Sequence, residues 1–168
     1  MKQRKNVFNV VRAFRSICER NSEYALVLGG RAEGEYVNEM KRYIASEGIQ
    51  HRVHFIGHLN DGQLSFIYRR AQALVFASFI EGFGYPVLEA MACGTPVITS
   101  KSTSLGEICQ NGSALLVNPA RVEELAEAME RIARDTRVRE ELIRNGHEQA
   151  KKFSWEKAGR EMIEAITK

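Results

Sequence analysis

The sequence predicts an α/β protein in which helices cover both faces of a doubly wound parallel sheet. Short apolar runs, two of them followed directly by a glycine, alternate with longer segments whose apolar residues recur at helical spacing. Strands that alternate with helix-length segments are typical of βαβ units and a parallel sheet. The apolar runs are also continuous, which indicates strands buried on both faces, as parallel strands usually are.

The amino-terminal third predicts the order helix, strand, helix, strand. Apolar residues at helical spacing predict a helix over Asn6–Glu19. The run Tyr24–Leu28 is continuous and apolar, and the glycine pair that follows ends this first strand. Helical spacing returns over Tyr36–Ile44, and a second strand at Val53–Ile56 closes at Gly57.

The middle of the sequence predicts a third strand followed by a loop. Asn60 and Gln63 have the spacing of a capping box, so a short helix begins there and precedes a strand at Ala73–Ala77. A loop over Ser78–Tyr85 leads to a helix that Pro86 can begin, because proline in the first turn gives up only an amide without a helical partner. In doubly wound sheets ligands bind at the carboxyl ends of the strands, so this loop is the expected binding place.

The last part predicts two further strands and then only helices. The strands are expected at Pro96–Thr99 and Ala114–Val117, with a helical turn at Leu105–Cys109 between them. Beyond them the apolar spacing is helical to the end, and Ser154 can cap the last helix. Trp155 is expected to anchor that helix against the body of the protein. The five strands and their helices predict a Rossmann-like architecture.

Composition and charge narrow the class of protein. The 168 residues are 44% hydrophobic and 27% charged, which suits one globular domain of residues 1–168. The formal net charge of +3 is small, and acidic and basic residues interleave along the predicted helices, so we expect no nucleic-acid partner. The three cysteines lack disulfide or zinc spacing, which favours a cytoplasmic protein without a metal site. No apolar run approaches the length of a membrane helix.

The loop that begins at Glu81 has the features of an anion-binding turn. Gly82 and Gly84 let the backbone approach a ligand closely, and the helix at Pro86 begins with free amides and the positive end of its dipole. A diphosphate suits these amides, whereas a carboxylate suits sugar hydroxyls. Glu81 is therefore expected to bind a sugar, and Glu89, further along the helix, a ribose diol.

The segment Glu-Gly-Phe-Gly-Tyr-Pro-Val-Leu-Glu, residues 81–89, resembles the EX7E motif of the family 4 (group 1) glycosyltransferases. The resemblance continues through Ala-Met-Ala-Cys-Gly-Thr-Pro-Val-Ile, residues 90–98. It also includes Arg4-Lys-Asn near the start, residues 53–57 and 77–78, and Phe-Ser-Trp at 153–155. It implies the GT-B fold and, within it, the C-terminal domain that binds the nucleotide-sugar (NDP-sugar) donor.

The resemblance also implies roles for particular residues. Glu81 is the expected catalytic-site residue, in contact with the donor sugar hydroxyls, and Glu89 is expected to bind ribose. Lys5 resembles the diphosphate lysine, although the Gly-Arg turn that precedes this lysine in the family is absent here, which makes the clamp incomplete. The other residues expected to line the donor site are Gly57, Ser78, Gly82, Phe83, Gly84, Tyr85, Pro86, Val87 and Leu88.

The expected function is that of one half of an enzyme. A helix opens the sequence where a strand is usual, so we expect a fragment that lacks the first strand and the N-terminal acceptor domain. The resemblance implies transfer of a hexosyl group from an NDP-sugar with retention, in carbohydrate biosynthesis and without a metal or other cofactor. The fragment alone is expected to be inactive, and any peripheral membrane association would come through the acceptor domain. The alternative is a non-catalytic nucleotide-sugar-binding or interaction module.

Simpler interpretations of the same residues remain open at this stage. Glu81 and Glu89 are also compatible with two solvated acids near a helix start, or with a glycosidase-type pair of carboxylates. Lys5 is equally compatible with a disordered basic terminus. Cys93 suits a small buried residue better than a nucleophile. The spacing of His51, His54 and His58 favours surface positions over metal ligation.

Overall fold

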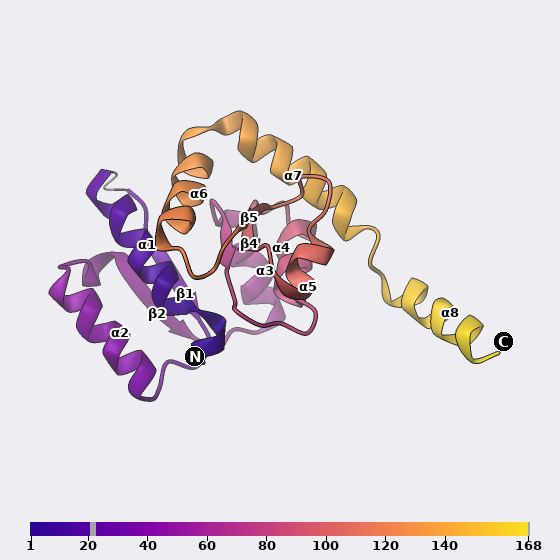
Figure 1. The fold of residues 1–168 in the computed structure, drawn as a ribbon, viewed down its shortest axis with the longest axis horizontal. Helices are drawn as coiled ribbons and strands as arrows, with labels where there is room; N and C mark the ends of the chain where they lie inside the picture. Colours follow the sequence, from indigo (N-terminus) through magenta and orange to yellow (C-terminus); the bar gives the residue numbers. More distant parts are fainter. Residues whose placement is uncertain (21–22, 168) are drawn as a thin grey trace.

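The computed structural model describes residues 1–20 and 23–167 and has the predicted α/β architecture (Figure 1). The strands are β1 (Leu26–Gly29), β2 (Val53–Gly57), β3 (Leu74–Phe76), β4 (Val97–Ser100) and β5 (Leu115–Val117). The helices are α1 (Val7–Arg20), α2 (Glu35–Ser46), α3 (Asp61–Arg70), α4 (Tyr85–Ala92), α5 (Thr103–Ile108), α6 (Val122–Arg134), α7 (Thr136–Ala150) and α8 (Trp155–Ile166), with 3-10 turns η1 (Gln3–Lys5) and η2 (Gln50–Arg52).

All five predicted strands are confirmed, and every pair is parallel. They form two sheets instead of a single one: β1 pairs with β2, and β3, β4 and β5 pair in that order. In the described residues no ladder of hydrogen bonds joins β1 to β3. The fold class is therefore as predicted, and the division of the sheet is the feature that the sequence did not reveal.

The three-stranded sheet is covered on both faces. One face packs on α1, α6 and α7 through residues such as Ala13, Leu125 and Leu142. The opposite face packs on α3, α4 and α5, where Met91 and Leu105 are almost fully buried. Burial between two helical layers explains why all four residues of β4 are buried, including the small polar residues Thr99 and Ser100.

The two-stranded sheet is covered on one face. Leu28 and Val53 pack there on α1 and α2, with Val37 and Met40 of α2 fully buried. Alternate residues point the other way, so Val27 is 44% exposed. This alternation of buried and exposed residues is typical of a sheet with one solvated face.

Local signals predicted the ends of several helices correctly. The Asn60 side chain accepts from the amide of Gln63, and the Gln63 side chain accepts from the amide of Asn60, which confirms the capping box of α3. Ser154 accepts from the amide of Lys157 at the start of α8, as predicted. Helix α4 begins at Tyr85, one residue before Pro86.

The expected role of Trp155 is wrong. Helix α8 extends away from the rest of the molecule, and in this fully described helix no residue is buried (Figure 1). Trp155 itself is 77% exposed, and its ring stacks on Tyr85 with the centroids 6.1 Å apart. The apolar positions of α8 therefore have no core to pack on within the described part of the chain.

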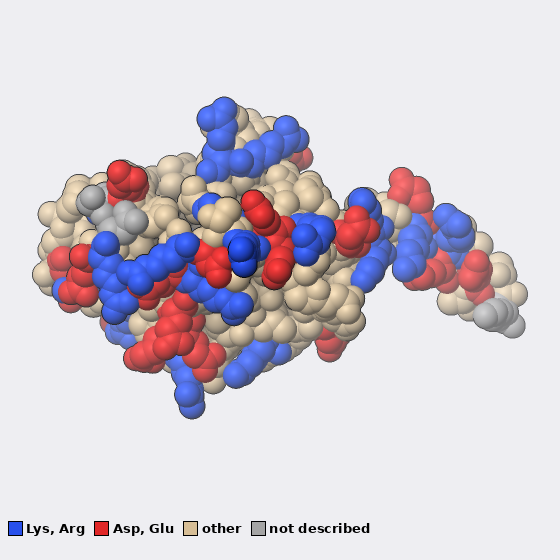
Figure 2. Space-filling view, turned by 90° about the horizontal axis from the view of Figure 1, so that it is seen from above, with Lys and Arg blue, Asp and Glu red and all other residues tan. Residues whose placement is uncertain are grey.

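The surface agrees with two further predictions. His51, His54 and His58 are all exposed, which confirms that they are surface residues. On the face shown in Figure 2, Lys and Arg interleave with Asp and Glu instead of forming a stripe of one sign. Within residues 1–20 and 23–167, no helix combines the length and the hydropathy needed to cross a bilayer.

Candidate functional site

The amino-terminal residues are tied to the carboxyl ends of the strands. Asn6 adopts a left-handed conformation with φ of 57°, which ends η1, and its side chain is buried. Its Nδ2 donates to the carbonyl of Ala77 at 3.0 Å, just after β3, and to that of Pro119 at 2.6 Å, after β5. Lys5 is consequently held at the edge of the sheet, and the interpretation of this segment as a disordered basic terminus is wrong.

Lys5 and Glu81 form an ion pair at this edge. Lys5 Nζ lies 2.5 Å from Glu81 Oε1 and 5.0 Å from the centroid of the Phe76 ring. The Glu81 side chain is only 10% exposed, so its carboxylate has lost most of its hydration and depends on the lysine for compensation. Two residues that are 76 positions apart in the sequence, both predicted to bind the same ligand, are thus in direct contact.

The loop after Glu81 is anchored at both ends and open in the middle. The Ser104 hydroxyl of α5 donates to the Glu81 carbonyl at 2.9 Å. Gly84 has φ of 117°, and a Cβ added there would lie 2.6 Å from Cδ2 of Leu105, so this position requires glycine. At Gly82 an added Cβ would meet no atom within 4 Å. The backbone at Gly82 is therefore accessible, while the flanking residues are fixed.

The start of α4 presents its positive end to this loop. Gly84 immediately precedes the helix, and its carbonyl accepts from the amide of Val87 at 2.9 Å. The Val87 side chain is fully buried, and the half-buried Leu88 packs on the same core. Pro86 is half-buried in the first turn.

Ser78 is also interior. It is fully buried, and its carbonyl accepts from the Ser100 hydroxyl at 2.6 Å. Among the described residues its own hydroxyl has no hydrogen-bond partner. The predicted contact of Ser78 with a ligand would require the loop above it to move, because no part of its side chain reaches the surface.

The side chain of Glu89 lies near a residue of another helix. It is exposed on α4, and its carboxylate interacts with the hydroxyl of Tyr68 on α3. Burial, followed by the charge of Glu89, raises the pKa of Tyr68. The structure thus brings Lys5 and Glu81 together but places Glu89 beside Tyr68.

Gly57 lies at the carboxyl end of the smaller sheet. It has φ of 68°, and its carbonyl accepts from the amide of Gly30 at 2.6 Å. The glycines therefore close a tight junction between the ends of β1 and β2, which agrees with their interpretation as strand-end turns.

Phe83 and Tyr85 are exposed aromatic residues that follow Glu81 in the loop. Their ring centroids are 4.8 Å apart, and Phe83 also contacts Phe153 at 6.0 Å. Together with the Tyr85–Trp155 stack, these contacts join the glycine loop to the segment that precedes α8. Phe83 and Tyr85, both predicted to line the donor site, therefore also connect the glycine loop to the C-terminal segment.

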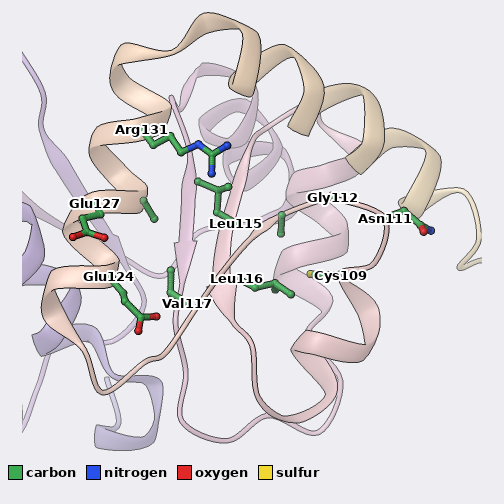
Figure 3. Close-up of a pocket in the computed structure, with 11 residues that line it drawn as sticks. Cys109, Asn111, Gly112, Leu115, Leu116, Val117, Glu124, Glu127 and Arg131 are labelled. Carbon is green, nitrogen blue, oxygen red and sulfur yellow. The ribbon is translucent and has the colours of Figure 1, made fainter.

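A separate cavity of about 560 Å³ lies at the outer edge of the larger sheet, between β5 and α6 (Figure 3). Its lining includes Leu116, Glu127 and Arg131 but none of the residues predicted to bind a ligand. Figure 3 shows Glu124 and Glu127 on α6 alongside the strand. We place the candidate site at the Lys5–Glu81 pair instead, because anion-binding amides and paired charges meet there at the carboxyl ends of the strands.

Three residues of the site were not predicted. Asn6 positions Lys5, Ser104 holds the Glu81 carbonyl, and Ser100 holds the carbonyl of Ser78. The available signal was the position of Ser100 and Ser104 just after the strand expected at 96–99, where polar side chains meet the edge of the sheet. Nothing local indicated that Asn6 would reach two strand ends.

The fold is a parallel α/β domain, and its candidate ligand site is a glycine-rich turn that leads into a helix. Residues 1–149 match the family described as "Glycosyl transferases group 1", and the chain belongs to that family. The structural relatives have the GT-B fold, and this chain corresponds to its C-terminal domain.

Two sequence relatives are mannosyltransferases. The chain is 32% identical over 167 residues to the O-antigen chain mannosyltransferase B of Escherichia coli, covering 98% of this chain and 43% of that protein. It is 32% identical over 153 residues to the MMP alpha-(1->4)-mannosyltransferase of Mycolicibacterium hassiacum, covering 89% of this chain and 36% of that protein. The chain thus spans less than half the length of both relatives.

Solved structures share the fold. Sucrose-phosphate synthase from Thermosynechococcus elongatus has a TM-score of 0.83 at 30% identity, covering 99% of this chain and 42% of that one. Anabaena HepE in complex with UDP-glucose has a TM-score of 0.89 at 22% identity, covering 99% of this chain and 46% of that one. The C-terminal domain of the group 1 protein LpcC from Francisella tularensis has a TM-score of 0.83 at 24% identity, covering 90% of this chain and 80% of that one.

Proposed function

We propose that this domain binds the NDP-sugar donor of a retaining glycosyltransferase that transfers a hexosyl group to an acceptor. The observation on which the proposal depends is the Lys5–Glu81 ion pair, which lies beside the glycine turn and the start of α4. Membership of the group 1 family and the UDP-glucose complex of HepE, a protein of the same fold, support this choice of ligand. The acids at 81 and 89 form the EX7E motif of the proposal.

In the proposed complex the ligand replaces the ion pair. The diphosphate attracts Lys5, and the backbone of the exposed residues Gly82 and Phe83 together with the positive end of α4 adds to this attraction. Glu81, released from Lys5, accepts hydrogen bonds from the sugar hydroxyls, which compensate its burial as the lysine did before. The site therefore exchanges one set of charged hydrogen bonds for another on binding.

Glu89 would bind the ribose of the same ligand. It is exposed, so its carboxylate can turn from Tyr68 toward a diol without uncovering the core. Because ribose belongs to both the nucleotide and the nucleotide sugar, this contact should contribute equally to both ligands.

The remaining steps need groups beyond this domain. We propose that the acceptor is bound by a further domain of the polypeptide, and that transfer retains the configuration of the anomeric carbon. Lys5 and the amides of the turn would stabilise charge that develops on the leaving diphosphate, a role that requires no metal ion. The protein would act in the cytoplasm, where Cys18, Cys93 and Cys109 remain the free thiols that the structure shows.

Calorimetry with Glu81→Ala tests the role of the acid. The substitution should weaken binding of the NDP-sugar on the order of tenfold or more, because it removes contacts to the sugar. It should leave the affinity for the bare NDP unchanged or raise it, because Lys5 no longer has a competing partner. Glu107→Ala, on the exposed side of α5, is the matched control. Equal losses for the two ligands would refute the sugar contact.

Two further substitutions separate the proposed subsites. Lys5→Ala and Glu89→Ala should each weaken the bare NDP and the NDP-sugar by similar factors, since phosphates and ribose are common to both. An unchanged affinity of Glu89→Ala for NDP would remove this residue from the site. Thermal-shift measurements with UDP-, GDP- and ADP-sugars identify the nucleotide that the domain binds, because a ligand that binds the native state raises the unfolding temperature.

A further inference from the structure

Strand β5 forms the outer edge of the three-stranded sheet and, in the described chain, has a hydrogen-bonded neighbour on one side only. The carbonyl of Val117 accepts from the amide of Lys101, just beyond β4, at 2.9 Å, so the backbone of Val117 faces β4. Successive residues of a strand direct these groups to opposite sides, so the amide and carbonyl of Leu116 face outward. Asn118 also faces outward, because its amide donates to the Glu124 carboxylate of α6 at 2.7 Å. The free edge therefore offers one donor and one acceptor at Leu116.

Side chains at this edge alternate between the two faces of the sheet. Leu115 and Val117 pack with the part of the core that α6 covers, and Ala114 packs with the opposite part. Leu116 points to the same face as Ala114 but is 42% exposed. It also lines the cavity that runs along the edge (Figure 3). A large apolar side chain is thus uncovered next to a backbone that can pair with another strand.

Helix α6 lines the same cavity with one stripe of its surface. The stripe has helical spacing and consists of Glu124, Glu127, Ala128 and Arg131. Figure 3 shows Glu124 near the carboxyl end of β5 and Arg131 near its amino end, because α6 runs antiparallel to the strand. The stripe is therefore negative at one end and positive at the other.

The charges of Glu127 and Arg131 have no partner within the described molecule. A Glu and an Arg four positions apart on a helix commonly pair, but in residues 1–20 and 23–167 neither side chain has a hydrogen bond or an ion pair. By contrast, Glu130 of the same helix pairs with both Arg20 and Arg134. An acid and a base beside the free edge are consequently available to a partner that brings the opposite charges in the reverse order.

We infer that the edge of β5 is the contact between two copies of this chain, related by a two-fold axis at Leu116. In an antiparallel pair, two opposite residues exchange both of their backbone hydrogen bonds, so the outward amide and carbonyl of Leu116 pair with those of Leu116 in the second copy. The two exposed leucine side chains then cover each other on one face of the joined sheet. On the other face the axis reverses the direction of α6, so Arg131 of each copy meets Glu124 and Glu127 of the other.

The spacing of the elements suits this arrangement. Helix α6 packs on both β4 and β5. Strands lie about 4.8 Å apart, so a helix above that pair lies about 5 Å from the two-fold axis and about 10 Å from its counterpart, a normal packing distance for two helices. The Lys5–Glu81 pair lies at the carboxyl ends of the strands and takes no part in this contact. Assembly and the proposed ligand binding can therefore succeed or fail separately.

Sedimentation equilibrium of the chain tests the inference. One short strand pair and one helix pair form a small interface, for which we expect a dissociation constant of about 10 μM. Leu116→Pro removes only the outward amide, a change that an edge strand tolerates, and should raise this constant by at least about tenfold. Arg131→Glu places like charges opposite each other and should raise it by at least about tenfold too. Arg69→Glu, at an exposed position of α3, is the matched control and should leave the constant unchanged.

Exchanging charges separates a contact between two copies from a general loss of structure. An equimolar mixture of the Arg131→Glu and Glu127→Arg proteins should form a heterodimer at least about tenfold tighter than either variant forms with itself, because each supplies the charge that the other needs. This mixture keeps the test decisive if Leu116→Pro does not fold. A chain that stays monomeric up to about 200 μM would overturn the inference. So would a dimer that Arg131→Glu or a folded Leu116→Pro leaves intact, or a mixture that stays monomeric.

Discussion

The two sheets of this domain differ in how their strands are surrounded. Strand β4 lies between two strands and two helical layers, and all of its residues are buried. Strand β1 has one neighbouring strand and one helical layer in the described chain, and Val27 and Gly29 are exposed. The three-stranded sheet is thus the more completely packed of the two, and the Lys5–Glu81 site is attached to it.

The largest difference should appear when one residue of each sheet is truncated. Ile98→Ala in β4 should lower the free energy of unfolding by about 3 kcal/mol, because it opens a cavity at a fully buried position. Val27→Ala in β1 should cost less than about 0.5 kcal/mol, as exposed substitutions usually do. Urea unfolding of the two variants measures both values. Comparable losses would mean that the two sheets contribute equally to stability.

The attachment of the amino terminus to the larger sheet is the next test. Asn6→Ala should cost about 2 kcal/mol, because it removes the Asn6 donor from the carbonyl of Ala77 and leaves the carbonyl of Pro119 with only the 3.3 Å contact from Asn9. Asn9→Ala removes only a 3.3 Å contact to Pro119 and serves as the control. Chemical denaturation should rank Asn6→Ala as clearly less stable, and the reverse ranking would show that Asn6 does not anchor this segment.

The glycine loop should show a smaller and local contrast. Gly84→Ala should lower stability by about 1–2 kcal/mol, since φ is positive and the new Cβ would meet Leu105. Gly82→Ala has free space and should change stability by less than about 0.5 kcal/mol. Thermal unfolding of the pair is sufficient, and a Gly84→Ala protein as stable as Gly82→Ala would show that the loop is not fixed at this point.

The thiols report the smallest difference between the two halves. Burial raises the pKa of Cys109, beside the larger sheet, to about 12, and burial also raises the pKa of Cys18 on α1, which is opposed there by Arg52 and Arg15. Iodoacetamide at pH 8 should therefore modify the half-buried Cys18 at least tenfold faster than Cys109. Reaction of Cys109 should accelerate as the pH rises toward 12, because the thiolate fraction increases. Mass spectrometry measures the rate of modification of each cysteine. Equal rates for Cys18 and Cys109 at pH 8 would contradict the prediction.

Much of the fold could be predicted from local patterns. The strand predicted at 96–99 is observed as β4, one residue further along, because the short run around Val97 and Ile98 has a local signature. The capping box at Asn60 begins α3 because its hydrogen bonds lie within four residues. Trp155 shows the limit of such patterns. Its position in an amphipathic helix predicts a buried face, but burial depends on what lies opposite, which no local pattern specifies.

The site was predictable in type but not in arrangement. The turn at Gly84 could be predicted, because a position with positive φ favours glycine and the next helix has a proline in its first turn. The contact between Lys5 and Glu81, the burial of Ser78 and the pairing of Glu89 with Tyr68 all depend on how separate elements pack. Whether these residues bind a nucleotide sugar stays a prediction.

The sequence alone determined the order of helices and strands and the presence of an anion-binding turn, because backbone preferences and apolar spacing act over a few residues. Tertiary structure decided which strands pair, which face of each helix is covered and which charges meet. Those outcomes depend on contacts between residues far apart in the chain, such as Asn6 with Pro119 and Lys5 with Glu81, and their energies exist only once the core has brought the strand ends together.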